Sequence, residues 1–193
     1  MDAILDAASA ILVEDGLAGL TMDAIVKRSG TSKSSLYHFF RDIGCVMDAL
    51  LDRHALAVST INENLLAETV DWGSQSLEET VRRFMNPMID YVEAHPDFLL
   101  VIRATRPRSD QKLCCSGAET LMIDRAEQMI AARTPSTPPS ERRARATMMF
   151  ATMVGAMEMS ERTQLPSRTS LLREAYKVLV AYLAAADAEE AAA

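Results

Sequence analysis

The amino-acid sequence predicts an all-α protein of about nine helices. Three observations support this fold class. Alanine, leucine and methionine dominate the 193 residues, of which 49% are hydrophobic and 5% aromatic, and such proportions favour helices. Apolar residues recur with helical spacing in segment after segment, whereas none alternates with the two-residue period of a strand. Most of the seven prolines stand between these segments, where a proline ends a helix.

The first third of the chain predicts four helices in quick succession. The first helix has a single apolar stripe, which consists of Ile4, Leu5, Ala8, Ile11 and Leu12. Thr21, Ser32 and Asp42 each stand just before an expected helix, where a side-chain oxygen can accept from a free backbone N–H group. Gly16 and Gly30 fit left-handed helix ends. The three later helices are expected near residues 22–29, 33–39 and 43–66.

The remaining two thirds also predict helices. Ser76 and Glu79 have capping-box spacing, and Pro87 lies inside the helix that follows, where we expect a kink. The expected helices cover residues 77–94, 97–106, 118–133, 140–162 and 169–186, and residues 107–117 are expected to form a loop. Together the elements predict a three-helix N-terminal domain that a long helix joins to a larger helical C-terminal domain.

Residues 21–40 read TMDAIVKRSGTSKSSLYHFF and have the pattern of a helix-turn-helix. Ile25 and Val26 would bury one side of the first helix, and Gly30 would form the turn. Leu36 and Phe39 would hold the second helix against the others. The other face of that second helix carries hydrogen-bonding side chains: Lys33, Ser34, Ser35, Tyr37 and His38. A short helix with so many exposed donors suits the major groove of DNA.

From Ile4 to Phe40 the sequence resembles the tetracycline-repressor (TetR) family, most specifically in the block from Ser32 to Phe40. The resemblance implies a DNA-binding domain over residues 1–47 and a ligand-sensing and dimerisation domain over residues 48–193. It also implies contacts from Thr21, Tyr37 and Ser32 to phosphates. The residues expected at base edges or nearby phosphates are Lys33, Ser34, Ser35 and His38. The family often has a lysine where Ile43 stands, and Arg41 is the expected substitute.

The formal net charge of −7 argues at first against binding to nucleic acid. The distribution of charge matters more than the total. Lys27, Arg28, Lys33 and Arg41 lie in a stretch that contains no acid. The stretch predicts either a local cationic face on an acidic molecule or an ordinary solvated cluster.

The C-terminal domain holds nine of the twelve methionines between Met85 and Met159. Methionine fills irregular space, so the set is compatible either with ordinary core packing or with the malleable apolar pocket that the resemblance implies. The residues expected to line that pocket are Met85, Met88, Tyr91, Arg103, Phe150 and Met153. Arg103 could pair with a ligand carboxylate or stay solvated.

The last two helices have apolar residues on more than one face. In the family these helices form a four-helix bundle between two subunits, which implies a homodimer. The residues expected at the dimer interface are Val154, Met157, Leu172 and Leu179. Burial of these residues within one subunit is the alternative.

Several classes of protein are excluded. No apolar run is long enough to span a membrane, no signal peptide is recognised, and the odd set of Cys45, Cys114 and Cys115 fits a cytoplasmic location. Glycine patterns and catalytic motifs are absent, so we expect no enzyme, no cofactor and no metal. A redox role for Cys45 is conceivable, and an inert side chain is the simpler interpretation. Together with the helix-turn-helix and the methionine-rich C-terminal domain, the resemblance to the TetR family implies a repressor that binds a palindromic operator in double-stranded DNA and is released by a small, mostly apolar effector. The alternative is a helical adaptor that acts through protein contacts.

Overall fold

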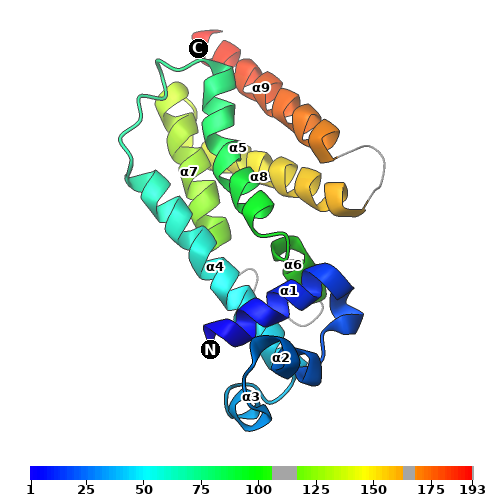
Figure 1. Cartoon of the computed structure of the whole chain (residues 1–193). Coiled ribbons are helices and arrows are strands. Elements are labelled where there is room, and N and C mark those ends of the chain that lie inside the picture. The colour runs from blue at the N-terminus through cyan, green and yellow to red at the C-terminus, as the bar shows by residue number, and fades with distance from the viewer. Residues whose placement is uncertain (106–116, 163–167, 193) are drawn as a thin grey trace. The chain divides into compact units, whose positions relative to one another are not determined.

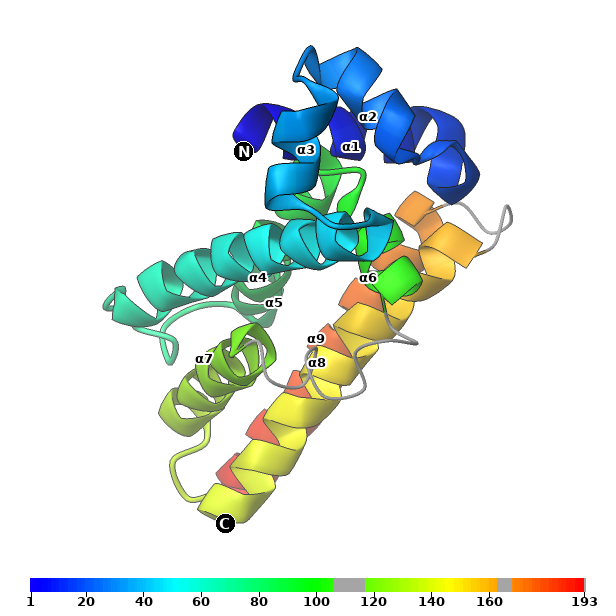
Figure 2. The ribbon, with the colours of Figure 1, turned by 90° about the horizontal axis from the view of Figure 1, so that it is seen from below.

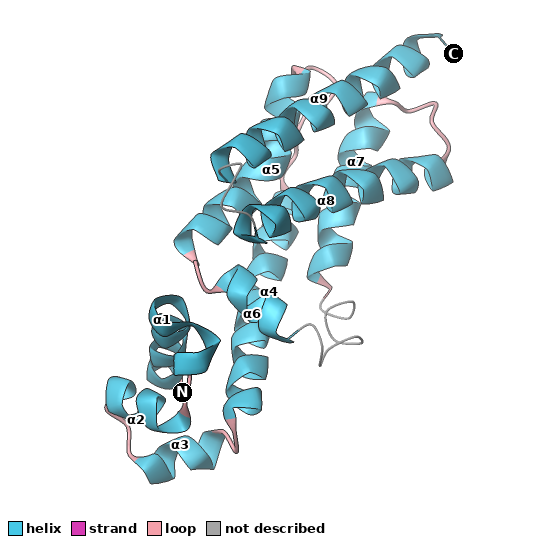
Figure 3. Cartoon of the chain, turned by 90° about the vertical axis from the view of Figure 1, so that its right-hand side faces the viewer, coloured by secondary structure: helices cyan, strands magenta, loops and turns pink. Residues whose placement is uncertain are grey.

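The structure, a computed structural model, describes residues 1–105, 117–162 and 168–192. Every regular element in these ranges is an α-helix, as predicted (Figure 3). The helices are α1 (Asp2–Gly19), α2 (Met22–Ser29), α3 (Lys33–Phe39), α4 (Ile43–Ala67), α5 (Leu77–Ala94), α6 (Phe98–Thr105), α7 (Ala118–Arg133), α8 (Pro139–Arg162) and α9 (Arg168–Ala192). In the described part of the chain, no helix combines the length and apolarity that crossing a bilayer requires.

The chain divides into two compact units. The described residues of unit 1 are 1–58 and 91–105, and those of unit 2 are 59–90, 117–162 and 168–192. Helices α4 and α5 therefore each contribute to both units. The functional boundary expected after residue 47 stays a prediction, because compactness and function need not divide a chain at the same place.

The core of unit 1 forms around the apolar stripe of α1, all five residues of which are buried as predicted. Ile25 of α2 and Leu36 of α3 are buried against it. The expectation that Phe39 anchors α3 is wrong, because its side chain is 51% exposed whereas that of Phe40 is 5% exposed. The cause is the helix end: α3 stops at Phe39, and the extended backbone of Phe40 (φ −134°, ψ 118°) lets the next ring enter the core.

The three predicted N-caps of unit 1 are confirmed. Thr21 Oγ1 accepts from the backbone N–H of Ala24 at 3.1 Å, and Ser32 Oγ accepts from that of Ser35 at 3.0 Å. Asp42 Oδ1 accepts from the N–H of Cys45 at 3.0 Å. Each cap satisfies one of the N–H groups that a helix start leaves without an intrahelical partner.

One of the two glycines expected at left-handed helix ends is confirmed. Gly16 interrupts α1 with φ 68° and ψ −173°, which lies outside the left-handed helical region, and α1 continues to Gly19. Gly30 ends α2 in the left-handed region, with φ 69° and ψ 8°. A side chain is strained in this region of φ and ψ, so glycine at position 30 permits the tight turn from α2 into α3.

Unit 2 is built around α8, which packs against both α7 and α9. Figure 2 shows α8 and α9 running side by side. Pro87 lies inside α5 as predicted. The guanidinium of Arg133, at the end of α7, donates to the backbone carbonyls of Trp72 and Gln75, both at 2.9 Å, and forms an ion pair with Asp187 of α9 at 2.5 Å. The Arg133 side chain therefore connects the segment before α5 to the end of α9 through hydrogen bonds and an ion pair.

Candidate nucleic-acid interface and sensor residues

Helices α2 and α3 form a helix-turn-helix against α1 (Figure 1). Leu36 is fully buried and anchors α3 in the core of unit 1. The other side chains of α3 are exposed. We call five of them the recognition face: Lys33, Ser34, Ser35, Tyr37 and His38. A helix held by one apolar side chain, with five exposed hydrogen-bonding side chains on its recognition face, has the chemistry that reads base edges.

All eight residues expected to contact DNA are exposed in unit 1. Five of them form the recognition face, and the other three are Thr21, Ser32 and Arg41. The hydroxyl oxygen of Thr21 accepts from Ala24 at its helix cap, which leaves the O–H group able to donate to a phosphate. The structure thus keeps the expected set accessible, and the contacts themselves stay a prediction.

The predicted cationic stretch is partly neutralised by acids that lie outside it in the sequence. Arg28 pairs with Glu14 of α1 at 2.5 Å, and Lys33 pairs with Asp23 of α2 at 2.9 Å. Arg41 pairs with its neighbour Asp42 at 3.2 Å. The folded chain therefore presents three ion pairs where the sequence alone indicated cations without acids.

These ion pairs keep their members charged. The hydrogen bond from Lys33 to Asp23 raises the pKa of the Lys33 ammonium, and the bond from Arg28 to Glu14 lowers the pKa of that carboxyl. The pKa of Asp42 is lowered first by the backbone N–H of Cys45 and then by Arg41. Exposed ion pairs of this kind contribute little to stability. A phosphate of DNA can therefore replace the carboxylate as the partner of each cation.

The six residues expected to line a ligand pocket fall in two units. Met85, Met88 and Met153 are buried in unit 2, and Phe150 of the same unit is half-buried. Tyr91 and Arg103 belong to unit 1. Arg103 is exposed on α6.

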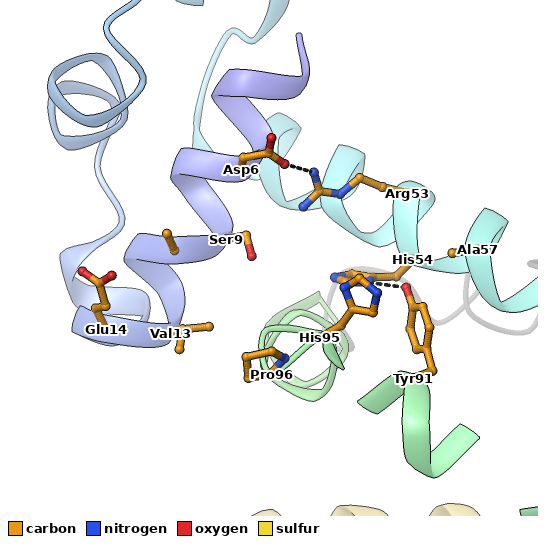
Figure 4. Close-up of a pocket in the computed structure, with 11 residues that line it drawn as sticks. Asp6, Ser9, Val13, Glu14, Arg53, His54, Ala57, Tyr91, His95 and Pro96 are labelled. Carbon is orange, nitrogen blue, oxygen red and sulfur yellow. Dashed lines mark hydrogen bonds and ion pairs between the residues drawn. The ribbon is translucent and has the colours of Figure 1, made fainter. Parts of the chain in front are cut away.

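Tyr91 lines a cavity of about 470 Å³ in unit 1 (Figure 4). Its hydroxyl lies 2.8 Å from Nδ1 of His54, whose Nε2 lies 3.1 Å from Oδ2 of Asp97. His54 and Asp97 are both 2% exposed. Burial and the charge of Asp97 raise the pKa of Tyr91 to about 12. Burial would raise the pKa of Asp97, but hydrogen bonds from His54 and Ser9 hold it at about 2.

Neither His54 nor Asp97 is predicted to be a functional residue from the sequence alone. They lie 43 positions apart, so no local spacing connects them. The available signal was a histidine in a helix whose neighbouring turns bury Leu50, Leu51 and Val58. A polar side chain on such a face needs a buried partner.

The residues expected at a dimer interface differ in exposure. Met157 and Leu179 are buried within the single chain, at 4% and 1% exposure, and Val154 and Leu172 are half-exposed. The large apolar side chains that α8 and α9 leave exposed are Met148, Met159 and Val178. Of the cysteines, Cys45 is half-buried, and Cys114 and Cys115 lie outside the described residues.

The sequence is similar to two known families that follow one another along the chain. Residues 4–50 match the family described as bacterial regulatory proteins, tetR family, and residues 76–183 match the family described as tetracyclin repressor-like, C-terminal domain. No curated protein matches the sequence.

Several solved structures are similar to this fold. A putative TetR-family transcriptional regulator from Mesorhizobium loti has a TM-score of 0.64 at 20% identity, over 95% of each chain. FadR from Bacillus subtilis, in complex with stearoyl-CoA, has a TM-score of 0.65 at 14% identity, over 93% of this chain and 97% of that one. The multidrug binding protein EbrR, in complex with imidazole, has a TM-score of 0.58 at 19% identity, over 94% of this chain and 93% of its own. At these identities the likeness shows the fold alone.

Proposed function

The chain belongs to the tetR family of bacterial regulatory proteins, and on that basis we propose that it is a cytoplasmic, homodimeric repressor that releases its operator when a small molecule binds. The recognition face carries this proposal. Only Leu36 of α3 is buried, and the polar side chains around it are exposed. Such a helix stabilises the fold little, whereas it is suited to insertion into the major groove.

The ion pairs at this surface favour a second candidate, the adaptor that acts through protein contacts. Lys33 and Arg28 are already paired with Asp23 and Glu14, and the net charge is −7. Both facts weaken the attraction to phosphates at long range. Exposed ion pairs are weak and exchange partners readily, so they reduce the affinity for DNA without preventing binding.

The effector is proposed to bind in unit 2, where Met85, Met88 and Met153 are buried. Methionine side chains adapt to ligands of different shape. Structures with a similar fold hold stearoyl-CoA and imidazole, which are very different molecules, so the fold does not indicate the effector. Helix α4 contributes to both units, and we propose that it carries the effect of the ligand to the recognition face.

The test is selection of a binding site from a pool of random DNA duplexes, followed by fluorescence anisotropy of the selected duplex over a range of salt concentrations. A dimer that places two copies of α3 in successive major grooves selects a palindrome with half-sites about 34–36 Å apart. The logarithm of the binding constant should fall linearly with the logarithm of the salt concentration. Enrichment of no sequence, together with no salt-dependent binding, would favour the adaptor.

A further inference from the structure

Three metal-ligating side chains meet in unit 1. His54 belongs to α4, His95 directly follows α5, and Asp97 directly precedes α6. One ligand atom of each lies within 4.8 Å of those of the other two. We propose that His54, His95 and Asp97 bind a divalent transition-metal ion of the Zn²⁺ class. The proposal depends on this cluster alone and not on the binding of DNA.

The distances suit such an ion. Zn²⁺ bonds of 2.0–2.1 Å in a tetrahedron place neighbouring ligand atoms about 3.3 Å apart, and His54 Nε2 lies 3.1 Å from Asp97 Oδ2. An ion can therefore replace the proton that this hydrogen bond shares, with little movement of either side chain. His95 is exposed, and rotation of its side chain can bring a ring nitrogen to the third position.

The surroundings orient the two buried ligands. A histidine that binds a metal through one nitrogen usually donates a hydrogen bond from the other, and His54 Nδ1 lies 2.8 Å from the hydroxyl oxygen of Tyr91. When Nε2 binds the ion, Nδ1 carries the proton and donates a hydrogen bond to that oxygen. Ser9 of α1 hydrogen-bonds to Asp97, which fixes the carboxylate.

His95 distinguishes a metal site from a purely structural network. The hydrogen bonds among His54, Tyr91 and Asp97 are complete without it, and among the described residues neither nitrogen of its ring has a hydrogen-bond partner. Its ring nevertheless lies 5.9 Å from that of His54, centroid to centroid, at the edge of the cavity (Figure 4). The exposed side of the cluster gives the ion a route of entry.

The cavity suits the rest of the coordination shell. Three protein ligands leave a fourth position for water or for a donor atom of a small molecule, and His54 and His95 both line the cavity of about 470 Å³. The bound ion would connect α4 to the segment between α5 and α6. Occupancy of the site should therefore stabilise unit 1 against unfolding.

The test is a titration of tag-free protein, freed of metals by a chelator, with Co²⁺, followed by visible absorption. We expect one ion per chain and the intense d–d bands of a four- or five-coordinate site. His95→Gln should weaken binding about tenfold to a hundredfold or more, because it removes a ligand. The matched control is His38→Gln, which removes the other exposed histidine and is judged by metal binding alone.

Zn²⁺ gives an independent measurement. It should raise the melting temperature of the wild-type chain and of His38→Gln but not that of His95→Gln. Circular dichroism should show the same helix content in all three, since both substitutions are at exposed positions. Equal Co²⁺ affinity in wild type and His95→Gln, a thiolate charge-transfer band indicating cysteine ligands, or no binding at 1 mM Co²⁺ (about −4 kcal/mol of binding free energy) would each overturn the proposal.

Discussion

Lys33 Nζ donates a hydrogen bond to Asp23 Oδ1 at 2.9 Å, so the first residue of α3 is tied to the first turn of α2. Both side chains are well exposed. Lys33, the lysine of the recognition face, therefore already forms an ion pair with Asp23 in the same unit. Binding of DNA through Lys33 must replace this carboxylate with a phosphate.

The first prediction concerns this exchange. Lys33→Ala should weaken operator binding and reduce the slope of log affinity against log salt by about one unit, because one phosphate contact is lost. Asp23→Asn should strengthen binding about twofold to fivefold, since Lys33 then has no exposed, weakly held ion pair to break before it contacts a phosphate. Anisotropy titrations at several salt concentrations measure both effects.

Asp52→Asn is the control for Asp23→Asn, because it removes an exposed acid of unit 1 and changes the net charge equally. If both acid-to-amide variants strengthen binding by the same factor, the effect comes from total charge and not from the release of Lys33.

The second prediction concerns the hydroxyl of Tyr37, whose side chain is 48% exposed on α3. Tyr37→Phe should weaken operator binding about fivefold, which corresponds to one hydrogen bond of about 1 kcal/mol, and should leave the melting temperature unchanged. The contrasting variant is Tyr176→Phe, because the Tyr176 hydroxyl donates to the backbone carbonyl of Glu78 at 2.8 Å in unit 2. That variant should lower stability and leave DNA affinity unchanged. If Tyr37→Phe lowered stability and left DNA affinity unchanged, while Tyr176→Phe weakened DNA binding, Tyr37 would be excluded from the DNA interface.

The local features of the helix-turn-helix were predictable because each depends on few neighbours. A cap needs a side-chain oxygen and the N–H groups of the next turn, and Thr21, Ser32 and Asp42 all supply one. The direction of the last ring of a short helix is harder to predict, because the residue after the helix can turn its own ring into the core. Phe39 was expected in the core, and the ring of Phe40 lies there instead.

Contacts between distant segments were not predictable from periodicity. His54, Tyr91 and Asp97 come from three different elements, and only the folded chain places them together. Arg125 of α7 is similar: it is a charged residue, yet its side chain is 3% exposed. The order of helices follows from sequence patterns, whereas such pairings depend on tertiary packing.

The third prediction concerns Arg125. Its guanidinium donates to Asn62 Oδ1 at 3.0 Å and to the backbone carbonyl of Phe84, and it lies 5.1 Å from the centre of the Phe84 ring. Burial lowers its pKa to about 10, so it stays charged at neutral pH. Arg125→Ala should reduce the free energy of unfolding by about 3–5 kcal/mol, because it removes two buried hydrogen bonds and creates a cavity.

Urea denaturation measures the effect of Arg125→Ala. Arg82→Ala is the control. Arg82 is exposed and pairs with Glu79 one turn earlier, so its removal should change the free energy of unfolding by about 0.5 kcal/mol or less. Equal losses in the two variants would show that the buried contacts of Arg125 do not stabilise unit 2.

The fourth prediction concerns coupling between effector and operator. A tenfold loss of operator affinity on binding an effector corresponds to about 1.4 kcal/mol of coupling, within the usual 1–3 kcal/mol for allostery. Reciprocity requires saturating operator to weaken effector binding by the same factor. Calorimetry of an effector found by thermal-shift screening, with and without operator, measures it. Identical affinities in the two titrations would contradict release by the effector while leaving DNA binding intact.

The fifth prediction concerns the dimer. Val178 is 54% exposed on α9, whereas its neighbour Leu179 is 1% exposed. Val178→Glu should therefore place a charge on the surface of α9 without disturbing the core, and Leu179→Glu should unfold unit 2. If α8 and α9 form the interface between subunits, Val178→Glu leaves a folded monomer, because a buried unpaired charge strongly destabilises an interface.

Sedimentation velocity and operator binding together decide this prediction. A monomer contacts only one half-site, so the splitting of the dimer and the loss of tight operator binding should occur in the same variant. Leu56→Glu is the matched control, because Leu56 is 71% exposed on α4, and this variant should remain a dimer. A Val178→Glu protein that sediments as a dimer and binds operator tightly would place the interface elsewhere. A wild-type chain that is monomeric at micromolar concentration, yet binds a palindromic operator tightly, would show that the dimer forms only on DNA.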